Sequence, residues 1–388
     1  MGDGRERLIP LFDVELTTEE IEAAADTLRS GWLTMGPRTE QFEQDFAAHL
    51  GCRHAVAVSS CTAALHLAYL AAGVRPGDEV IVPAITFVAT AAAVRYCGAT
   101  PVLADVRGEH DLNLDPDDVA ARITPRTKAI CAVHYAGFAA DVVRLGELCD
   151  EHGLALIEDA AHAPSATAPE SERKLGTYGL AGCFSFFSNK VLSCGEGGLL
   201  ATDDDEVAAL ARSRRSHAMT SGTWDRHRGH SAGYDVLDLG FNYRIDEPRA
   251  ALLAARLPSL EHNIAARREL VHRYRAEISG LDGVSAPFAD EEVERSSCYV
   301  MPTMVEDPEL REPLRARMLE RGVQTSVLYP AIHEFTAYAG GESLPHSERV
   351  ARAELTLPLF PTLAEADQER VLEALREGLS ELRGTVPA

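Results

Sequence analysis

An acid, an imidazole, a hydroxyl and a lysine occur at the ends of two short apolar runs in the middle of the chain. The first run, residues 154–157, leads into Asp159 and His162. The second run contains Ser185 and leads into Lys190. Short apolar runs of this kind are typical of buried strands, and ligands of open α/β sheets bind at the carboxyl ends of strands. We therefore expect these four side chains to converge on one crevice.

A lysine and a carboxylate in one pocket fit the chemistry of pyridoxal 5'-phosphate (PLP). The lysine amine forms a Schiff base with the cofactor, and the carboxylate keeps the pyridine nitrogen protonated. Burying an ammonium group beside Phe186 and Phe187 is costly, and imine formation removes that cost. Asp159 alone could be an ordinary helix cap, so the prediction depends on its pairing with Lys190. His162 could hydrogen-bond the 3-oxygen of the ring, although a single histidine is more often structural.

Other motifs could complete such a site. Residues 59–62, Ser-Ser-Cys-Thr, follow a predicted strand and open a helix at residues 63–72, where backbone amides can bind phosphate; a plain helix cap is the alternative. Phe87 could stack on a ring, and Asn242 and Arg244 are polar residues that either pair locally or reach a ligand. A basic, irregular segment at residues 212–230 is a candidate diphosphate site, although such segments are most often solvated loops.

Composition excludes several classes of protein. The 388 residues carry 37 basic and 60 acidic side chains, a net charge of -23, which argues against a nucleic-acid surface. The eight cysteines show no C-x-x-C or zinc-type spacing, and the first ten residues contain no apolar signal region. No run is long enough to cross a membrane. We expect a reduced, cytoplasmic protein without a metal site.

Strands and helices alternate through the first part of the chain, as in an open α/β sheet covered on both faces. A Thr17–Glu20 capping box precedes the first helix. A helix from Asp246 to Tyr274, interrupted by Pro258, is expected to bridge two domains, residues 1–258 and 259–388. The smaller C-terminal domain should be α+β, with strand-like pieces at 298–303 and 324–328. The seven predicted strands of the large domain are 55–59, 80–82, 101–104, 129–133, 154–157, 183–187 and 199–202.

The ordered motifs resemble those of the DegT/DnrJ/EryC1/StrS sugar aminotransferases, which are fold-type I PLP enzymes, and the resemblance covers nearly the whole chain. The shared stretches are Gly36-Pro37 with Phe42-Glu43, Ser60 to His66, Pro76 to Val80, Glu158 to His162, Phe184 to Lys190, Gly195 to Gly198, and Asn242 to Arg244. The family has Ser-Gly-Thr where this chain has Ser60-Cys61-Thr62; the Cys61 amide can still donate, but a glycine-only backbone angle is lost.

The resemblance implies a role for each matching residue. Lys190 would be the Schiff-base lysine and the proton-transferring base, Asp159 would face the pyridine nitrogen, and His162 would face the 3-oxygen. Phe87 would cover the ring. Cys61, Thr62 and Ser185 would hold the phosphate, and Asn242 would reach it from the neighbouring subunit of a homodimer. The residues implied for the substrate side are Thr34, Arg244, Tyr329 and His333.

The resemblance also implies a reaction. The amino group would pass from L-glutamate to a nucleotide-linked keto-deoxysugar, a dTDP-4-keto-6-deoxyhexose, in amino-sugar and antibiotic biosynthesis. A 3-keto sugar or an inosose is the nearest alternative acceptor. A catalytically silent PLP-binding regulator would lack the lysine, which is present at position 190. A nicotinamide-dependent oxidoreductase would need a G-x-G-x-x-G turn after the first strand, which residues 59–62 do not provide.

Overall fold

A seven-stranded sheet forms the centre of the computed structural model, which describes residues 7–169, 171–220 and 233–384. The strand order is β1-β9-β8-β7-β6-β2-β3, and only β9 runs antiparallel to its neighbours. These are the seven strands that the apolar runs predict, so the mostly parallel sheet is confirmed. The strands are β1 (His54–Val58), β2 (Glu79–Pro83), β3 (Thr100–Ala104), β6 (Thr127–Val133), β7 (Ala155–Asp159), β8 (Ala181–Ser185) and β9 (Gly198–Thr202).

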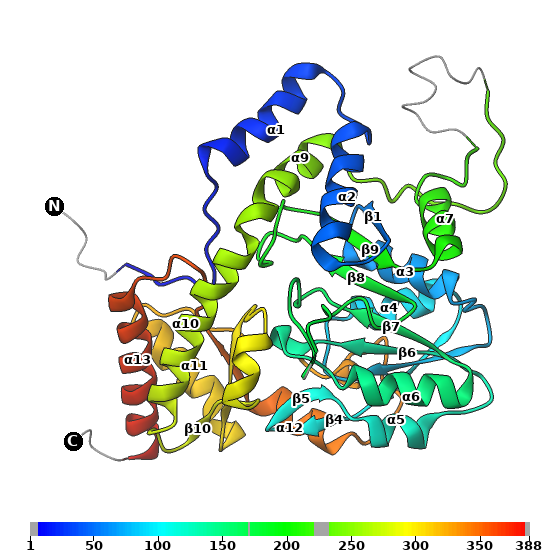
Figure 1. Cartoon of the computed structure of the whole chain (residues 1–388). Helices are drawn as coiled ribbons and strands as arrows, with labels where there is room; N and C mark the ends of the chain where they lie inside the picture. Colours follow the sequence, from blue (N-terminus) through cyan, green and yellow to red (C-terminus); the bar gives the residue numbers. More distant parts are fainter. Residues whose placement is uncertain (1–6, 170, 221–232, 385–388) are drawn as a thin grey trace.

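Helices cover both faces of this sheet (Figure 1). Successive side chains of a strand point to opposite faces. In β1, Val56 and Val58 pack in the core under α3 (Cys61–Ala71), whereas Ala55 and Ala57 pack in the core that contains α2 (Pro37–Leu50). Burial on both faces explains why the strands read as continuous apolar runs. The other helices on the sheet are α4 (Ala89–Tyr96), α5 (Pro116–Arg122), α6 (Val142–His152) and α7 (Asp205–Arg214).

The first helix, α1 (Thr18–Ser30), lies beside α9 (Glu247–Arg256), as Figure 1 shows. Its predicted capping box is present: the Glu20 amide donates to Thr17 Oγ1 at 3.2 Å, and the Thr17 amide donates to Glu20 Oε2 at 3.0 Å. The helix ends at Gly31, whose φ of 74° favours glycine. Local sequence signals therefore fix both ends of α1.

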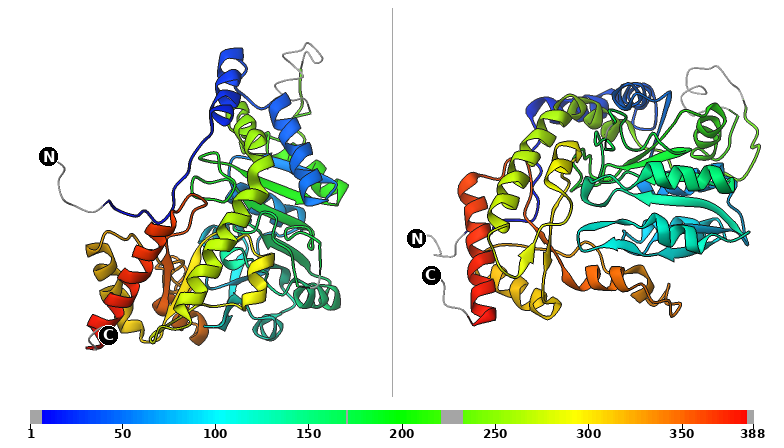
Figure 2. Two further views of the ribbon diagram at one scale, coloured as in Figure 1. Left: turned by 60° about the vertical axis from the view of Figure 1, so that its left-hand side comes forward. Right: turned by 60° about the horizontal axis from the view of Figure 1, so that its bottom comes forward.

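The predicted bridging helix is broken at a short 3-10 turn, η2 (Leu257–Ser259), which contains Pro258. α10 (Leu260–Ile278) continues beyond it and lies beside α13 (Glu365–Arg383) at the edge of the C-terminal part (Figure 2). A three-stranded antiparallel sheet completes this part, and the domain boundary at residue 258 stays a prediction. The remaining elements are β10 (Val284–Ser285), β11 (Met301–Val305), α11 (Arg311–Glu320), α12 (Pro345–Ala353) and β12 (Glu354–Leu357).

Two local predictions are wrong. Residues 324–328 form no strand, because their backbone groups bond to different partners: the Gln324 amide donates to Ile9 at 3.0 Å, and only Ser326 pairs with β12. The basic segment is not irregular at its start, since Arg212 and Arg214 lie within α7. The hairpin of β4 (Val106–Gly108) and β5 (Asp111–Leu114) was not predicted.

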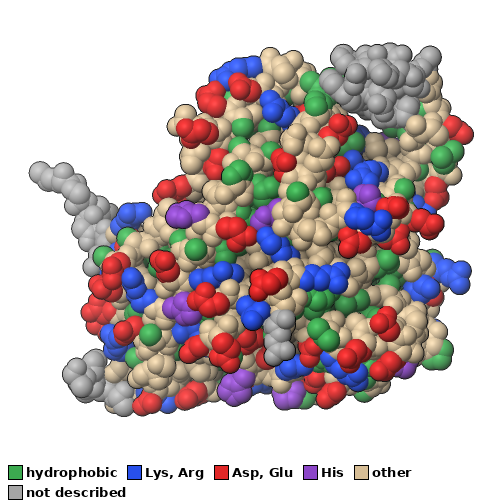
Figure 3. Space-filling view, in the orientation of Figure 1, with side chains coloured by type: hydrophobic (Ala, Val, Ile, Leu, Met, Phe, Trp, Pro, Cys, Tyr) green, Lys and Arg blue, Asp and Glu red, His purple; other side chains and the backbone are tan. Residues whose placement is uncertain are grey.

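The surface agrees with the charge balance. On the face in Figure 3, acidic and basic side chains are interspersed and do not form one basic surface. None of the helices in the described ranges combines the length and apolar character of a membrane span. The same ranges hold no group of three or more His, Cys, Asp or Glu side chains arranged to bind a metal ion.

Candidate active site

A cavity of about 340 Å³ lies at the carboxyl ends of β7 and β8. The two strands are adjacent and parallel, with Asp159 opposite Cys183, so the residues that follow them meet at one edge of the sheet. The structure brings together the four residues expected to converge and adds others predicted for the cofactor and substrate. The predicted residues that line the cavity are Cys61, Thr62, Phe87, Asp159, His162, Ser185, Lys190 and Tyr329.

Asp159 is the buried acid of this cavity. Thr90 Oγ1 donates to its Oδ2 at 2.8 Å, and the Ala161 amide donates to its Oδ1 at 3.2 Å. Burial raises the pKa of Asp159, while the Thr90 and Ala161 hydrogen bonds and the charge of Lys190 lower it. A cationic group in the cavity would stabilise the ionised form of this acid.

Lys190 lies at the cavity wall and not inside the apolar core. Phe186 packs against the α2 aromatic rings, but Phe187 is 44% exposed, so the lysine is only half-buried. Its Nζ lies 4.2 Å from the centroid of the Tyr299 ring. A cation over an aromatic face is attracted by the electron-rich face of the ring. The lysine is thus held at the cavity by a residue of the C-terminal part.

Two tyrosines hold His162. Its ring stacks on Tyr299 with centroids 4.3 Å apart, and its Nε2 lies 3.0 Å from the Tyr329 hydroxyl. Burial lowers the pKa of His162 well below its ordinary value, and the charge of Lys190 lowers it further. The imidazole is therefore neutral. Its Nδ1 is buried without a hydrogen-bond partner among the described residues.

The amino end of α3 forms another wall of the cavity. The Ser60 side chain accepts from the Ala63 amide at 3.2 Å, and the amides of Cys61 and Thr62 lie in the first turn, where a helix has no partners for them. Gly198 packs directly on this turn, since a Cβ there would overlap the backbone of Ser60 and Cys61. Gly198, the first residue of β9, thus allows the strand to approach the start of α3 closely.

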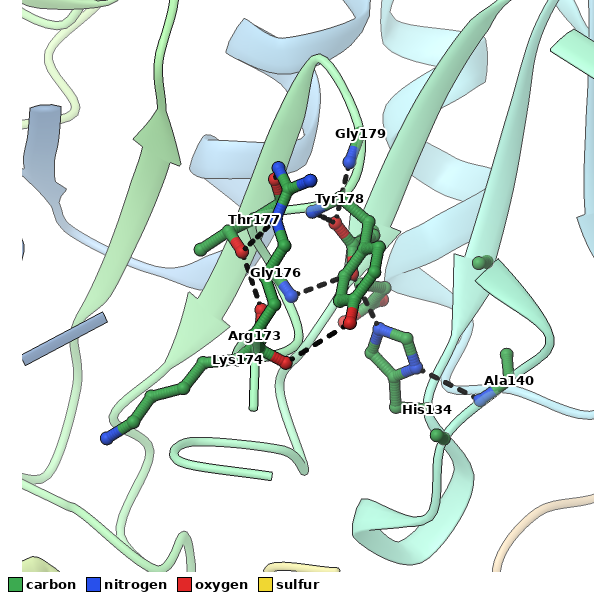
Figure 4. Close-up of polar contacts among 12 residues, drawn as sticks. His134, Ala140, Arg173, Lys174, Gly176, Thr177, Tyr178 and Gly179 are labelled. Atoms are coloured by element: carbon green, nitrogen blue, oxygen red, sulfur yellow. Dashed lines mark hydrogen bonds and ion pairs between the residues drawn. The ribbon is translucent and has the colours of Figure 1, made fainter. Parts of the chain in front are cut away.

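Glu158, the neighbour of Asp159, has a structural part. As successive strand residues, the two carboxylates point to opposite faces of the sheet. Glu158 accepts from the amides of Gly176, Tyr178 and Gly179 at 2.6–2.8 Å, and from His134 Nε2 at 3.1 Å; Figure 4 shows these donors converging. This cluster fixes the loop between β7 and β8.

Four predicted site residues lie outside this cavity. Thr34 precedes α2, and Asn242 is exposed beside Ser216, to which Arg244 Nη1 donates at 3.3 Å. His333 is half-buried, and its Nε2 lies 3.6 Å from Glu348 Oε1. Their roles stay predictions.

The arginines in the described part of the basic segment contact other parts of the chain. Arg212 donates to the Ala55 carbonyl at 3.3 Å, Arg214 pairs with Asp238, and Arg215 pairs with the buried Glu43. His217 is also described, and its amide donates to the Phe241 carbonyl at 2.9 Å, whereas the basic residues at 226–230 lie outside the described residues. Each of these three arginines already has a hydrogen-bond or ion-pair partner, and the diphosphate role of the segment stays a prediction.

Two contributors to the site were missed. Thr90 lies in α4, four residues after Thr86, whose hydroxyl is 3.0 Å away; a buried threonine pair in an alanine-rich helix was the available signal. Tyr299 lies just before β11, in a stretch whose pattern indicates only a strand. The sequence contains no local signal that would place Tyr299 against Lys190.

The residues present fit PLP. The cavity combines a lysine amine, a buried carboxylate suited to a pyridinium, a helix amino end suited to a phosphate, and a buried imidazole nitrogen with no partner in the described ranges. Its volume lies in the range of ligand pockets. Fold and site together define a fold-type I PLP-dependent aminotransferase.

Comparison with known proteins identifies the family. Residues 14–376 match the DegT/DnrJ/EryC1/StrS aminotransferase family, and the chain belongs to it. It is 36% identical to the spore coat polysaccharide biosynthesis protein SpsC of Bacillus subtilis (strain 168), over 97% of this chain and 98% of SpsC. The aminotransferase TlmJ of Streptoalloteichus hindustanus superposes with a TM-score of 0.90 at 37% identity, covering 97% of this chain and all of TlmJ. DesV of S. venezuelae superposes with a TM-score of 0.87 at 36% identity, covering 96% of this chain and 98% of DesV. The chain is thus a PLP-dependent sugar aminotransferase.

Proposed function

We propose that this enzyme moves the amino group of L-glutamate to a nucleotide-linked keto-deoxysugar, a dTDP-4-keto-6-deoxyhexose, as a cytoplasmic homodimer in amino-sugar and antibiotic biosynthesis. The observation that carries the proposal is the presence of Lys190 and Asp159 in one cavity. The similarity to SpsC, whose name refers to polysaccharide biosynthesis, supports a sugar acceptor.

Each residue contributes a separate part of the reaction. PLP, when bound, supplies an electron sink that stabilises negative charge at the substrate carbon. Lys190 moves the proton at that carbon, and Asp159 provides the negative charge opposite the pyridine nitrogen. Neutral His162 presents Nδ1 to the 3-oxygen. The amides and hydroxyls of Cys61, Thr62 and Ser185 bind the phosphate.

The homodimer would place Asn242 of one subunit at the phosphate of the other. Asn242 is exposed, and the nearby Leu237 and Leu239 are 71% and 75% exposed. Large apolar side chains on one exposed arm are typical of a surface that packs against a partner. Replacing Asn242 by alanine should weaken PLP retention in the dimer, measured by equilibrium dialysis; unchanged retention would contradict this contact.

The acceptor is tested by assaying the purified enzyme with L-glutamate against dTDP-4-keto-6-deoxyhexoses, 3-keto nucleotide sugars and inososes. Mass spectrometry identifies the aminated product. The proposal predicts the highest kcat/KM with a dTDP-4-keto-6-deoxyhexose. Preferential amination of an inosose or a 3-keto sugar would contradict the acceptor, while leaving the aminotransferase class in place.

A further inference from the structure

A fully buried acid of the C-terminal part lies behind the active site. Glu354 opens β12 and has no exposed surface. Its Oε2 accepts from the Leu328 amide at 2.6 Å, and its Oε1 accepts from Thr356 Oγ1 at 2.6 Å. The carboxyl group therefore connects the start of strand β12 to the backbone of a neighbouring loop.

This loop leads directly into the cavity. Ser326 exchanges two backbone hydrogen bonds with Thr356, of 3.1 and 2.9 Å, and this pairing stops there. Two residues later the Leu328 amide bonds to Glu354 instead of to a backbone carbonyl. The next residue, Tyr329, lines the cavity, and its hydroxyl lies 3.0 Å from His162 Nε2. The backbone amide next to Tyr329, that of Leu328, is thus held by a side chain.

We propose that Glu354 is a positioning residue of the active site, which holds the Leu328 amide so that the Tyr329 hydroxyl reaches His162. Without this acceptor, the half-buried Leu328 amide would lose a partner that Ser326 and its backbone pairing cannot replace. The loop would then shift to reach another acceptor, and Tyr329 would move with it. The inference depends on the aminotransferase class of the chain, and not on the proposed sugar or amino donor.

The surroundings of Glu354 determine its charge. The charges of Arg311 and Arg315, both of α11, lower the pKa of Glu354, and the hydroxyl groups of Tyr135 and Tyr329 lie close enough to interact with it electrostatically. Burial outweighs the two arginines and raises the pKa of Glu354 to about 8. The raised pKa favours the protonated acid, in which the Thr356 hydrogen bond reverses: Oε1 carries the proton and donates to the Thr356 hydroxyl, while Oε2 still accepts from the Leu328 amide. Glutamine is a close isostere of this form, because its amide oxygen can accept from Leu328 and its NH₂ group can donate to the Thr356 hydroxyl.

A double-mutant cycle between Glu354→Ala and Tyr329→Phe tests the inference. The readout is the single-turnover rate at which the amino acid that reacts fastest with wild-type holoenzyme converts the bound cofactor, followed by absorbance. We expect Glu354→Ala to lower this rate about tenfold, and to lower it less than about twofold further when Tyr329→Phe is already present. Glu354→Gln should stay within about twofold of wild type. If Glu354→Ala does not fold, Glu354→Asp, which is one methylene short of the Leu328 amide, takes its place.

Thr303→Val is the matched control. Thr303 is buried in the same small sheet, and its hydroxyl donates to the Leu355 carbonyl of β12 at 2.7 Å and not to the loop before Tyr329. This variant should lower thermal stability and leave the single-turnover rate unchanged. Equal fold-losses for the Glu354 variant with and without Tyr329→Phe would overturn the proposal, as would a Glu354→Gln enzyme as slow as Glu354→Ala.

Discussion

Replacing Thr90 by valine tests how the cavity stabilises the charge of Asp159. The change keeps the shape of the side chain and removes the 2.8 Å hydrogen bond to Oδ2, between two buried groups. Hydrogen bonds to charged groups contribute about 1.5–3 kcal/mol. The Thr90 hydrogen bond stabilises the ionised carboxylate of Asp159 more than the protonated form. In the absence of cofactor, the free energy of unfolding of Thr90→Val should therefore be lower than that of wild type by about this amount at high pH.

The expected effect depends on pH with a definite sign. The pKa of Asp159 is raised by burial, so ionising it costs stability as the pH rises through that pKa. Thr90 offsets this cost, and the difference between Thr90→Val and wild type should therefore be larger at pH 8 than at pH 5. Urea unfolding at both pH values measures it, and PLP affinity should fall in parallel because the pyridinium loses its ionised partner.

Thr90→Ser is the control, since it keeps the hydroxyl that donates to Asp159 and contacts Thr86. It should resemble wild type in the pH dependence of its stability and in PLP affinity. If Thr90→Val and Thr90→Ser unfold with the same free energy at both pH values, the hydrogen bond does not stabilise the carboxylate and the reasoning is wrong.

Three other substitutions give distinct outcomes. The free energy of unfolding of Glu354→Gln should rise relative to that of wild type between pH 5 and pH 8, as measured by urea unfolding. The reason is that the wild-type protein loses stability as the pH rises from the ordinary pKa of this acid, 4.5, towards about 8. A difference that stays constant with pH would contradict the raised pKa. Tyr299→Leu should slow the single-turnover rate about two- to fivefold, because it removes a cation–π attraction of about 0.5–1 kcal/mol on Lys190. Tyr299→Phe keeps the ring under Lys190 and should leave the rate unchanged. Equal rates for the two variants would contradict a role for the ring contact. Gly198→Ala should destabilise the protein by about 1–3 kcal/mol in thermal unfolding, because the added Cβ would overlap the start of α3. The control is Gly146→Ala on α6, where the added Cβ meets open space and should not destabilise the protein. Equal melting temperatures for the two variants would contradict the close approach of β9 to α3.

The sequence predicts the large sheet well because its strands are buried on both faces and read as continuous apolar runs. The residues that follow β7 and β8 could be assigned to one crevice for the same reason, since adjacent parallel strands end at one edge. Asp159 and Lys190 lie within these local signals, and the structure places both at the cavity.

Apart from Tyr329, which the family resemblance implies and which lines the cavity, the C-terminal contribution could not be predicted. Tyr299 and Glu354 act through contacts between segments far apart in the chain, and neither lies in a pattern that indicates a ligand. Residues 324–328 look like a strand, but their backbone groups bond to Ile9, to β12 and to a side chain in turn. The proposed contact of Asn242 with a neighbouring subunit comes from the family resemblance and from no local signal around Asn242.

The central claim is that PLP attaches to Lys190 beside Asp159. Reducing the purified holoenzyme with borohydride and digesting it for mass spectrometry tests this claim most directly, because the reduced bond survives digestion and its position can be sequenced. The account predicts a phosphopyridoxyl group on the peptide that contains Lys190, and none in Lys190→Ala. A modification on another lysine, or the same catalytic rate in Lys190→Ala, would contradict it.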